Sequence, residues 1–146
     1  MTEGNGFWLR MTRLLSGSRP DIWRAMTDPA ELARWWGPHG FTTPSIEFEP
    51  RIGGSYRIAM RPAEGEVFHL DGEFREVDPP SRIAYTFRWD PPAPDDRETL
   101  VTLSLRERGK QTEVELAQGE FATQERLELH DSGWNDSFEK LEGLLG

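Results

Sequence analysis

The chain has 146 residues, no cysteine, and a formal net charge of -9 from 17 basic and 26 acidic side chains. This length suits a single domain, residues 1–146, because two domains would each have too small a core. The lack of cysteine excludes disulfides, thiolate nucleophiles and cysteine-bound metals, and the acidic charge disfavours nucleic acids and anionic membrane surfaces as partners.

Aromatic residues make up 11% of the chain, with six tryptophans and eight phenylalanines. Because aromatic side chains bury the most area per residue, we expect an aromatic core or an aromatic-lined cavity. The opening residues, MTEGNGFW, lack the charged and apolar regions of a signal peptide. No apolar run approaches the roughly 20 residues that cross a bilayer. The expected location is therefore cytoplasmic.

The first regular pattern, residues 7–15, predicts a strand. Apolar and polar residues alternate as far as Met11, and the apolar phase then shifts to Leu14 and Leu15, which indicates a β-bulge. Ser18 is the expected cap of a short helix that follows, with a proline in its first turn.

A second short helix is predicted directly after the first. Its expected cap, first helical residue and capping-box residue are Asp28, Pro29 and Glu31. Leu32, Trp35 and Trp36 form one apolar stripe over two turns, and Gly37 followed by Pro38 ends the helix. Adjacent helical residues are about 100° apart. We therefore expect one tryptophan ring to be buried against a C-terminal helix and the other to line a cavity or its mouth.

The middle of the chain alternates with a period of two, which is typical of half-buried strands. The apolar positions of five such strands are Ile46, Phe48, Tyr56, Ile58, Met60, Ile83, Tyr85, Phe87, Trp89, Val101, Leu103, Leu105, Val114 and Leu116. A further strand between Val67 and Val77 has an ambiguous phase because Gly72 interrupts it. The short connections permit hairpins but no parallel crossovers, so we predict an antiparallel meander.

Helical spacing returns from Thr123 to Leu145. One apolar stripe of this helix consists of Leu127, His130, Trp134, Phe138, Leu141 and Leu145. Gly133 lies beside the stripe and weakens a helix by about 1 kcal/mol. We interpret this glycine as permitting a close approach or a kink.

Four segments carry a family resemblance: AMTDPAELARWWGPHGFTTP, RIGGSYRIAM, GEFREVDPPSRIAYTFRW and HDSGWNDSFEKLEGLL. With the order of the elements, they resemble the activator-of-heat-shock-ATPase-homologue family, within the superfamily of START-related lipid-transfer proteins and polyketide cyclases (SRPBCC). The resemblance extends from about Leu9 to Leu145. It implies an α+β helix-grip fold, in which a curved antiparallel sheet surrounds a long C-terminal helix and two short helices follow the first strand.

The resemblance also implies an apolar cavity between the sheet and the C-terminal helix that binds a hydrophobic small molecule. The candidate ligand-binding residues are Trp35, Trp36, Tyr56, Ile58, Met60, His69, Tyr85, Phe87, Trp89, Leu103, Trp134, Phe138 and Leu141. Taken singly, each of them more often fills a core than contacts a ligand, since packed interiors are the norm.

Catalytic motifs are absent from the sequence. It has no phosphate loop and no G-x-S-x-G nucleophile setting. His39, His69 and His130 lack metal-ligand spacing, so we expect no metal and no cofactor. Two alternatives to ligand binding remain open. One is a co-chaperone-type regulator that acts through a protein partner or as a homodimer, and the other is a cyclase-like enzyme acting on an aromatic or polyketide-like substrate.

Overall fold

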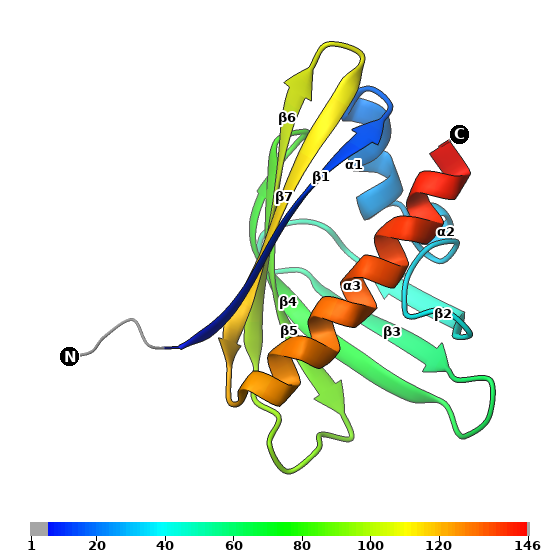
Figure 1. The fold of residues 1–146 in the computed structure, drawn as a ribbon, viewed down its shortest axis with the longest axis vertical. Helices are drawn as coiled ribbons and strands as arrows, with labels where there is room; N and C mark the ends of the chain where they lie inside the picture. Colours follow the sequence, from blue (N-terminus) through cyan, green and yellow to red (C-terminus); the bar gives the residue numbers. More distant parts are fainter. Residues whose placement is uncertain (1–5, 146) are drawn as a thin grey trace.

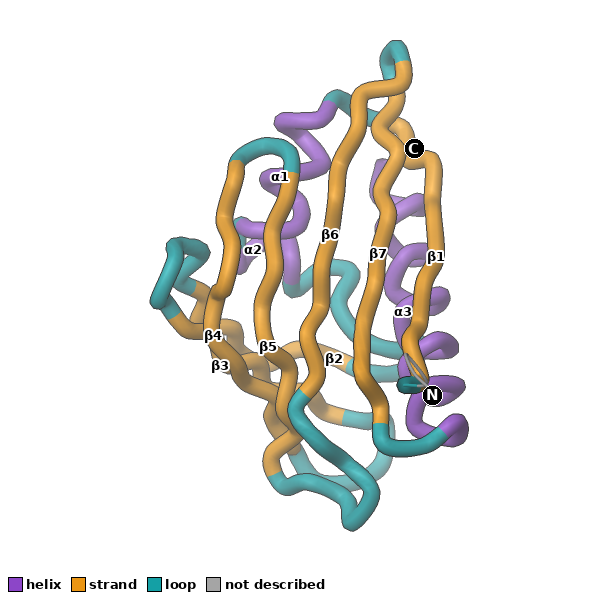
Figure 2. The backbone as a smooth tube through the Cα atoms, turned by 90° about the vertical axis from the view of Figure 1, so that its left-hand side faces the viewer, coloured by secondary structure: helices purple, strands orange, loops and turns teal. Residues whose placement is uncertain are grey.

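Seven strands form one curved sheet, and the long C-terminal helix crosses its concave side (Figure 1). The computed structural model describes residues 6–145. The strands are β1 (Phe7–Ser16), β2 (Thr42–Phe48), β3 (Ser55–Arg61), β4 (Phe68–Asp78), β5 (Arg82–Asp90), β6 (Thr99–Arg108) and β7 (Gln111–Phe121). The helices are α1 (Arg19–Thr27), α2 (Pro29–Leu32) and α3 (Gln124–Leu145). Figure 2 shows the helices together behind the sheet.

The strand order is β1-β7-β6-β5-β4-β3-β2, and every neighbouring pair is antiparallel. Short connections join the consecutive strands from β2 to β7, while β1 pairs with β7 at one edge. The predicted meander and helix-grip fold are therefore confirmed. The single-domain prediction also covers residues 1–5 and 146, which lie outside the described residues, and it stays a prediction.

The two helix starts follow the predicted caps. The Ser18 hydroxyl accepts a hydrogen bond from the Asp21 amide at 3.3 Å, and the Asp28 carboxylate accepts from the amides of Ala30 and Glu31 at 2.9 and 3.3 Å. The capping box is wrong, because the Asp28 amide already donates to the Arg24 carbonyl, the last turn of α1. The Glu31 carboxylate accepts instead from Arg24 Nε at 2.7 Å.

Helix α2 is shorter than the two turns predicted. It ends at Leu32, although the amide of Trp36 still donates to the Leu32 carbonyl at 3.0 Å. Gly37 follows with φ of 94°, a left-handed conformation that glycine adopts without strain. The two tryptophans therefore lie on a tight turn, directly before the chain changes direction.

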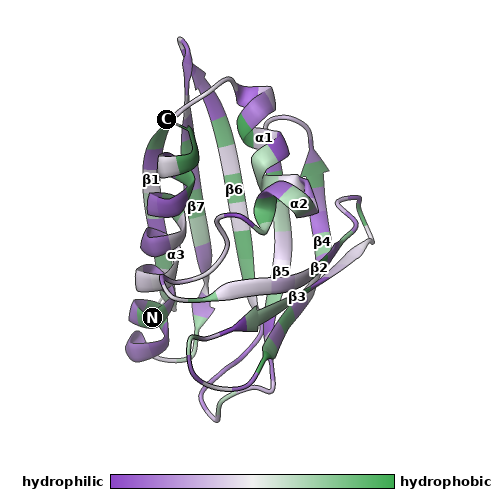
Figure 3. Ribbon diagram, turned by 90° about the vertical axis from the view of Figure 1, so that its right-hand side faces the viewer, coloured by the Kyte–Doolittle hydropathy of each residue, from purple (hydrophilic) through white to green (hydrophobic). Residues whose placement is uncertain are grey.

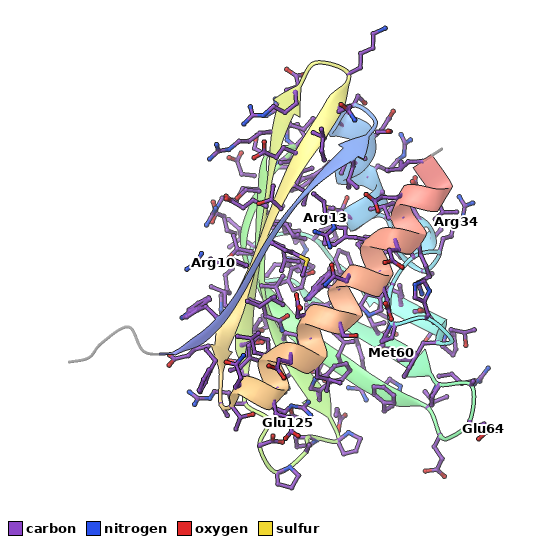
Figure 4. The ribbon with its side chains drawn as sticks, viewed as in Figure 1. Arg10, Arg13, Arg34, Met60, Glu64 and Glu125 are labelled. Carbon is purple, nitrogen blue, oxygen red and sulfur yellow. The ribbon has the colours of Figure 1, made fainter. Side chains whose placement is uncertain are left out.

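The bulge in β1 is not where the apolar phase predicted it. The register is continuous from Leu9 to Ser16, and the irregularity lies between Phe7 and Leu9. Leu14 is consequently exposed, and Arg13 points inward from β1 towards α3 (Figure 4). Arg13 is accommodated there because its guanidinium donates to the Asn135 side chain and lies over the Phe138 ring.

Gly72 marks a close approach, and the change of phase in β4 lies further along, where the register with β5 shifts between Phe74 and Glu76. A Cβ at this position would lie 1.9 Å from the Thr86 carbonyl oxygen of β5. Leu70 and Phe74, on either side of it, are both fully buried on the helix-facing side. Figure 3 shows apolar positions along the strand surfaces beneath the helices and mostly polar residues on the outer surface of α3.

The core near α1 is filled by large side chains. Trp35 stacks on Phe138 of α3, with ring centroids 6.1 Å apart and an angle of 18° between the planes. Its indole Nε1 donates to the Ala25 carbonyl at 2.9 Å. Ile22 and Leu141 are also fully buried in this region. The helices are thereby fixed on the sheet at this end.

Candidate functional site

A cavity of about 290 Å³ lies between α3, the loop after α2 and the ends of β3, β4 and β5. Its walls are predominantly apolar. The lining residues are Trp36, Gly37, Pro38, Phe41, Met60, Phe68, Phe87, Trp89, Pro91, Ala93, Asp96, Arg126, Leu129, His130, Gly133, Trp134 and Ser137. Leu129 is largely exposed, so its side of the cavity is close to solvent.

The sheet wall follows from strand alternation. Phe87 and Trp89 are two residues apart on β5 and share one face. Phe68 of β4 lies beside Trp89, with ring centroids 5.4 Å apart. Met60 of β3, labelled in Figure 4, lines the same wall. The three strands thus contribute one continuous apolar surface.

The helix wall is one face of α3. Its lining residues recur at intervals of three and four, from Arg126 through His130 and Gly133 to Ser137. The helix continues through Gly133, so no break occurs there. A Cβ at Gly133 would meet Pro38 Cγ at 3.8 Å, which is ordinary van der Waals contact. The glycine is therefore not required by the packing, and its missing side chain leaves room in the cavity.

The loop after Trp36 closes the third side, and hydrogen bonds fix it to α3. The Gly37 amide donates to the buried Ser137 hydroxyl at 3.0 Å, and the His39 amide donates to Asp136 at 3.1 Å. Lys140 Nζ donates to the Trp36 carbonyl at 3.2 Å. The wall therefore has a defined position although it is a loop.

The adjacent tryptophans have different roles. Trp35 is 1% exposed and belongs to the filled core, whereas Trp36 is 6% exposed and lines the cavity. The Trp36 ring meets Trp134 of α3 edge to face, with centroids 5.3 Å apart. One ring is thus buried against α3 and the other lines the cavity, although both tryptophans lie on the turn after α2 rather than within a helix.

His130 is the buried titratable group of the cavity wall. Its Nε2 accepts a hydrogen bond from Trp89 Nε1 at 3.1 Å, and its ring is surrounded by Phe87, Trp89 and Phe121. Burial, with a contribution from the charge of Arg126, lowers the pKa of His130 to about 3. The imidazole is consequently uncharged at neutral pH.

An ion pair lies at the same end of the cavity. Arg126 Nη2 pairs with the Asp96 carboxylate, and both side chains are largely buried. Asp95 Oδ1 is 4.0 Å from Arg126 Nε, and the Ala93 amide donates to Asp96 at 2.6 Å. The loop between β5 and β6 is thereby held against the first turns of α3, where Pro91 and Ala93 line the cavity.

The predicted site residues divide between the cavity and the core. Five of them line the cavity: Trp36, Met60, Phe87, Trp89 and Trp134. Seven others are buried in the core and do not line it: Trp35, Tyr56, Ile58, Tyr85, Leu103, Phe138 and Leu141. His69 lies between Phe68 and Leu70 on β4, and strand alternation directs it to the opposite face.

The core tyrosines illustrate why strand alternation could not distinguish core positions from cavity positions. Tyr56 faces inward as predicted, but its hydroxyl donates to the Thr86 carbonyl at 2.6 Å. Burial raises the pKa of Tyr56 and of Tyr85. Phe48 and Phe74 pack on these rings. Alternation identifies the inner face of a strand but not the neighbour that covers each position.

Several lining residues were missed. Phe41 follows a turn, Phe68 belongs to the strand of ambiguous phase, and Asp96 and Arg126 come from separate segments. A signal did exist for His130, which lies on the apolar stripe of the predicted helix. Its place between Trp134 and Leu127 indicated burial of a polar ring.

Three possible metal ligands meet outside the cavity. His39 Nε2 is 2.9 Å from Glu139 Oε1 and 3.8 Å from Asp136 Oδ1. Sequence spacing did not reveal this group because His39 is about 100 residues away from α3 along the chain. The side chains already pair with one another, and His39 and Glu139 are exposed, so we interpret them as a further attachment of the loop to α3.

Comparison with known families now identifies the fold's relatives. The model of the family described as Activator of Hsp90 ATPase homolog 1-like protein matches residues 17–146. The chain belongs to this family. The resemblance seen in the sequence is thereby confirmed, and members of the wider superfamily generally bind hydrophobic ligands. A comparison with curated proteins gave no match.

Solved structures of similar proteins share the architecture. Protein CV1439 from Chromobacterium violaceum is 28% identical, with a TM-score of 0.86 over 94% of this chain and 96% of that chain. A protein from Rhodobacter sphaeroides is 27% identical, with a TM-score of 0.83 over 99% and 95%. The AHSA1 protein from Silicibacter pomeroyi is 26% identical, with a TM-score of 0.83 over 94% and 96%.

None of the helices within residues 6–145 is long and apolar enough to span a bilayer.

Proposed function

We propose that this protein binds a hydrophobic small molecule in the cavity between the sheet and α3. The observation that carries the proposal is an unfilled space of about 290 Å³ with aromatic walls, directly beside a filled aromatic core. The apolar atoms of this wall lack the contacts that they would have in a filled core, and covering them with an apolar group is favourable. A ligand would supply those contacts.

The volume limits the size of the ligand. A cavity of about 150 Å³ accommodates one benzene molecule, so about 290 Å³ has room for roughly two fused rings. Trp36, Trp89 and Trp134 offer ring faces and edges against which a flat molecule can pack. The proposed ligand class is therefore a small bicyclic or similarly sized aromatic compound.

A pair of glycine substitutions in α3 tests the proposal. Gly133 lines the cavity. Gly143 is exposed on the same helix, and a Cβ at this position would meet no neighbouring side chain within 4 Å. Gly133→Leu should fill the cavity, and Gly143→Leu serves as the matched control. Binding of 2-ethylnaphthalene would be followed by tryptophan fluorescence and by native mass spectrometry.

We expect the wild type and Gly143→Leu to bind the probe and Gly133→Leu to lose binding. Equal binding by all three proteins would place the ligand elsewhere, and no binding by the wild type would contradict the proposal. Native mass spectrometry of the protein as purified would also show whether it carries a hydrophobic molecule.

The cyclase alternative requires buried polar groups beside the cavity, and Asp96, Arg126 and His130 are such groups. A general base works best when its pKa is close to the working pH. The pKa of His130 is lowered to about 3, so this imidazole is a weak base at neutral pH. His130 is therefore a poor candidate for proton abstraction, which leaves binding as the better-supported role. A protein-interaction role stays an alternative.

A further inference from the structure

We infer that His130 is the polar recognition residue of the cavity, a neutral imidazole that donates from Nδ1 to an oxygen acceptor on an uncharged aromatic ligand. The inference rests on the proposed function and specifies the ligand class. A carbonyl group on a molecule of about two rings would accept this hydrogen bond and fit the cavity, whereas a carboxylate would not fit.

The tautomer follows from the partner of His130. The indole nitrogen of tryptophan is a donor only, so His130 Nε2, 3.1 Å from Trp89 Nε1, must be the acceptor. A neutral imidazole that accepts at Nε2 carries its hydrogen on Nδ1. Protonating the ring would abolish the bond from Trp89. Trp89 therefore fixes His130 as a donor at Nδ1.

The Nδ1 atom is open to an approaching acceptor. Among residues 6–145, the fully buried side-chain nitrogens without a partner are Arg19 Nε and Arg126 Nε. Nδ1 of His130 also has no hydrogen-bond partner among residues 6–145. It does not belong to the fully buried atoms, however. Nδ1 therefore keeps some accessible surface, which we assign to the cavity side of the ring. The ring adjoins the main cavity and a neighbouring hollow of about 10 Å³, which is large enough for a single water at most.

Local charge argues against an anionic ligand. Arg126 is the cation among the cavity-lining residues, and it pairs with Asp96 and lies 4.0 Å from Asp95. The three groups together carry one net negative charge. A carboxylate placed beside His130 would meet this charge and lose its hydration without gaining a free cation.

Three probes with one bicyclic frame distinguish a purely apolar ligand, a neutral hydrogen-bond acceptor and an anion. They are 2-ethylnaphthalene, 2-acetylnaphthalene and 2-naphthoate. In the wild type we expect the acetyl compound to bind about fivefold more tightly than the ethyl compound, as for one added hydrogen bond. The naphthoate should bind most weakly. Affinities would be measured by tryptophan fluorescence at neutral pH and fixed salt.

Two substitutions test whether His130 causes the preference for the acetyl compound. His130→Phe should bind the ethyl and acetyl compounds equally, because it lacks the donor. His130→Gln should keep part of the acetyl preference, since its amide can accept from Trp89 and donate into the cavity. If neither variant folds, nitrogen-15 NMR of the wild type supplies an independent readout. The His130 Nδ1 resonance should shift with the acetyl compound and not with the ethyl compound.

The outcomes distinguish this inference from the proposed function. Binding of the ethyl compound without an acetyl preference would overturn the role of His130 and leave the cavity as an apolar binding site. A preference that persists in His130→Phe would do the same. Tightest binding of the naphthoate would instead make Arg126 the recognition residue. If the wild type binds no probe, both proposals fall.

Discussion

Two neighbouring parts of the sheet–helix layer differ although both are built from aromatic side chains. Around Trp35 and Phe138 the space is filled, and around Trp36 and Trp134 it is open. The difference comes from the backbone and from polar attachments. On the open side, Gly133 has no side chain, and hydrogen bonds fix the loop after α2 to α3. Whether aromatic side chains enclose a cavity therefore depends on how the walls are held in place as well as on their composition.

The largest expected effect distinguishes the two tryptophans. Trp35→Ala should lower the free energy of unfolding by about 3–5 kcal/mol, because it creates a void in a filled core. Trp36→Ala should cost at least about 1 kcal/mol less, since its ring already borders open space. Urea denaturation of both variants measures this. Equal losses would show that the two regions are one continuous core.

The second prediction concerns the wall formed by the loop. Ser137→Ala removes the acceptor of the buried Gly37 amide, which should cost about 1–3 kcal/mol. The loop should also become less well fixed, so binding of 2-ethylnaphthalene should weaken. Glu142→Ala, an exposed position on the same helix, measured in the same way, is the control. A destabilised Ser137→Ala protein with unchanged affinity would show that the wall does not depend on this attachment.

The third prediction uses pH. The pKa of His130 is about 3 when folded against about 6.5 for the free side chain, so the unfolded chain binds the proton more readily. Stability therefore falls as pH falls below about 6.5, by about 1.4 kcal/mol between pH 7.5 and pH 5.5. His130→Gln should lack this part of the pH dependence. Parallel curves for the two proteins in urea denaturation would contradict the buried neutral state.

The smallest expected effect tests why α3 contains Gly133. Gly133→Ala should raise stability by about 0.5–1 kcal/mol, because alanine is the better helix former and its Cβ meets only an ordinary contact. The same change should weaken probe binding by reducing the cavity. Thermal denaturation and fluorescence titration measure the two effects. A lower stability of Gly133→Ala than of the wild type would mean that close packing requires a glycine at this position.

The order of the elements and their antiparallel pairing could be predicted from the sequence by itself. Ser18 and Asp28 are cap residues whose side chains act within three residues of themselves. Period-two alternation is equally local, because successive side chains of a strand point to opposite faces. Different positions for Trp35 and Trp36 were expected from a helix, but the two residues lie on the turn that follows α2.

Only the tertiary structure decided where the open space lies. Arg13 occupies an inward position because Asn135 and Phe138 of α3 receive it. His130 borders the cavity because Trp89, 41 residues away, donates to it, and Arg126 is held by Asp96 of a different segment. These positions depend on which side chain arrives opposite each wall after the sheet has curved. Local periodicity determines the face of each residue, and the packing of distant segments determines whether that face meets a neighbour or a cavity.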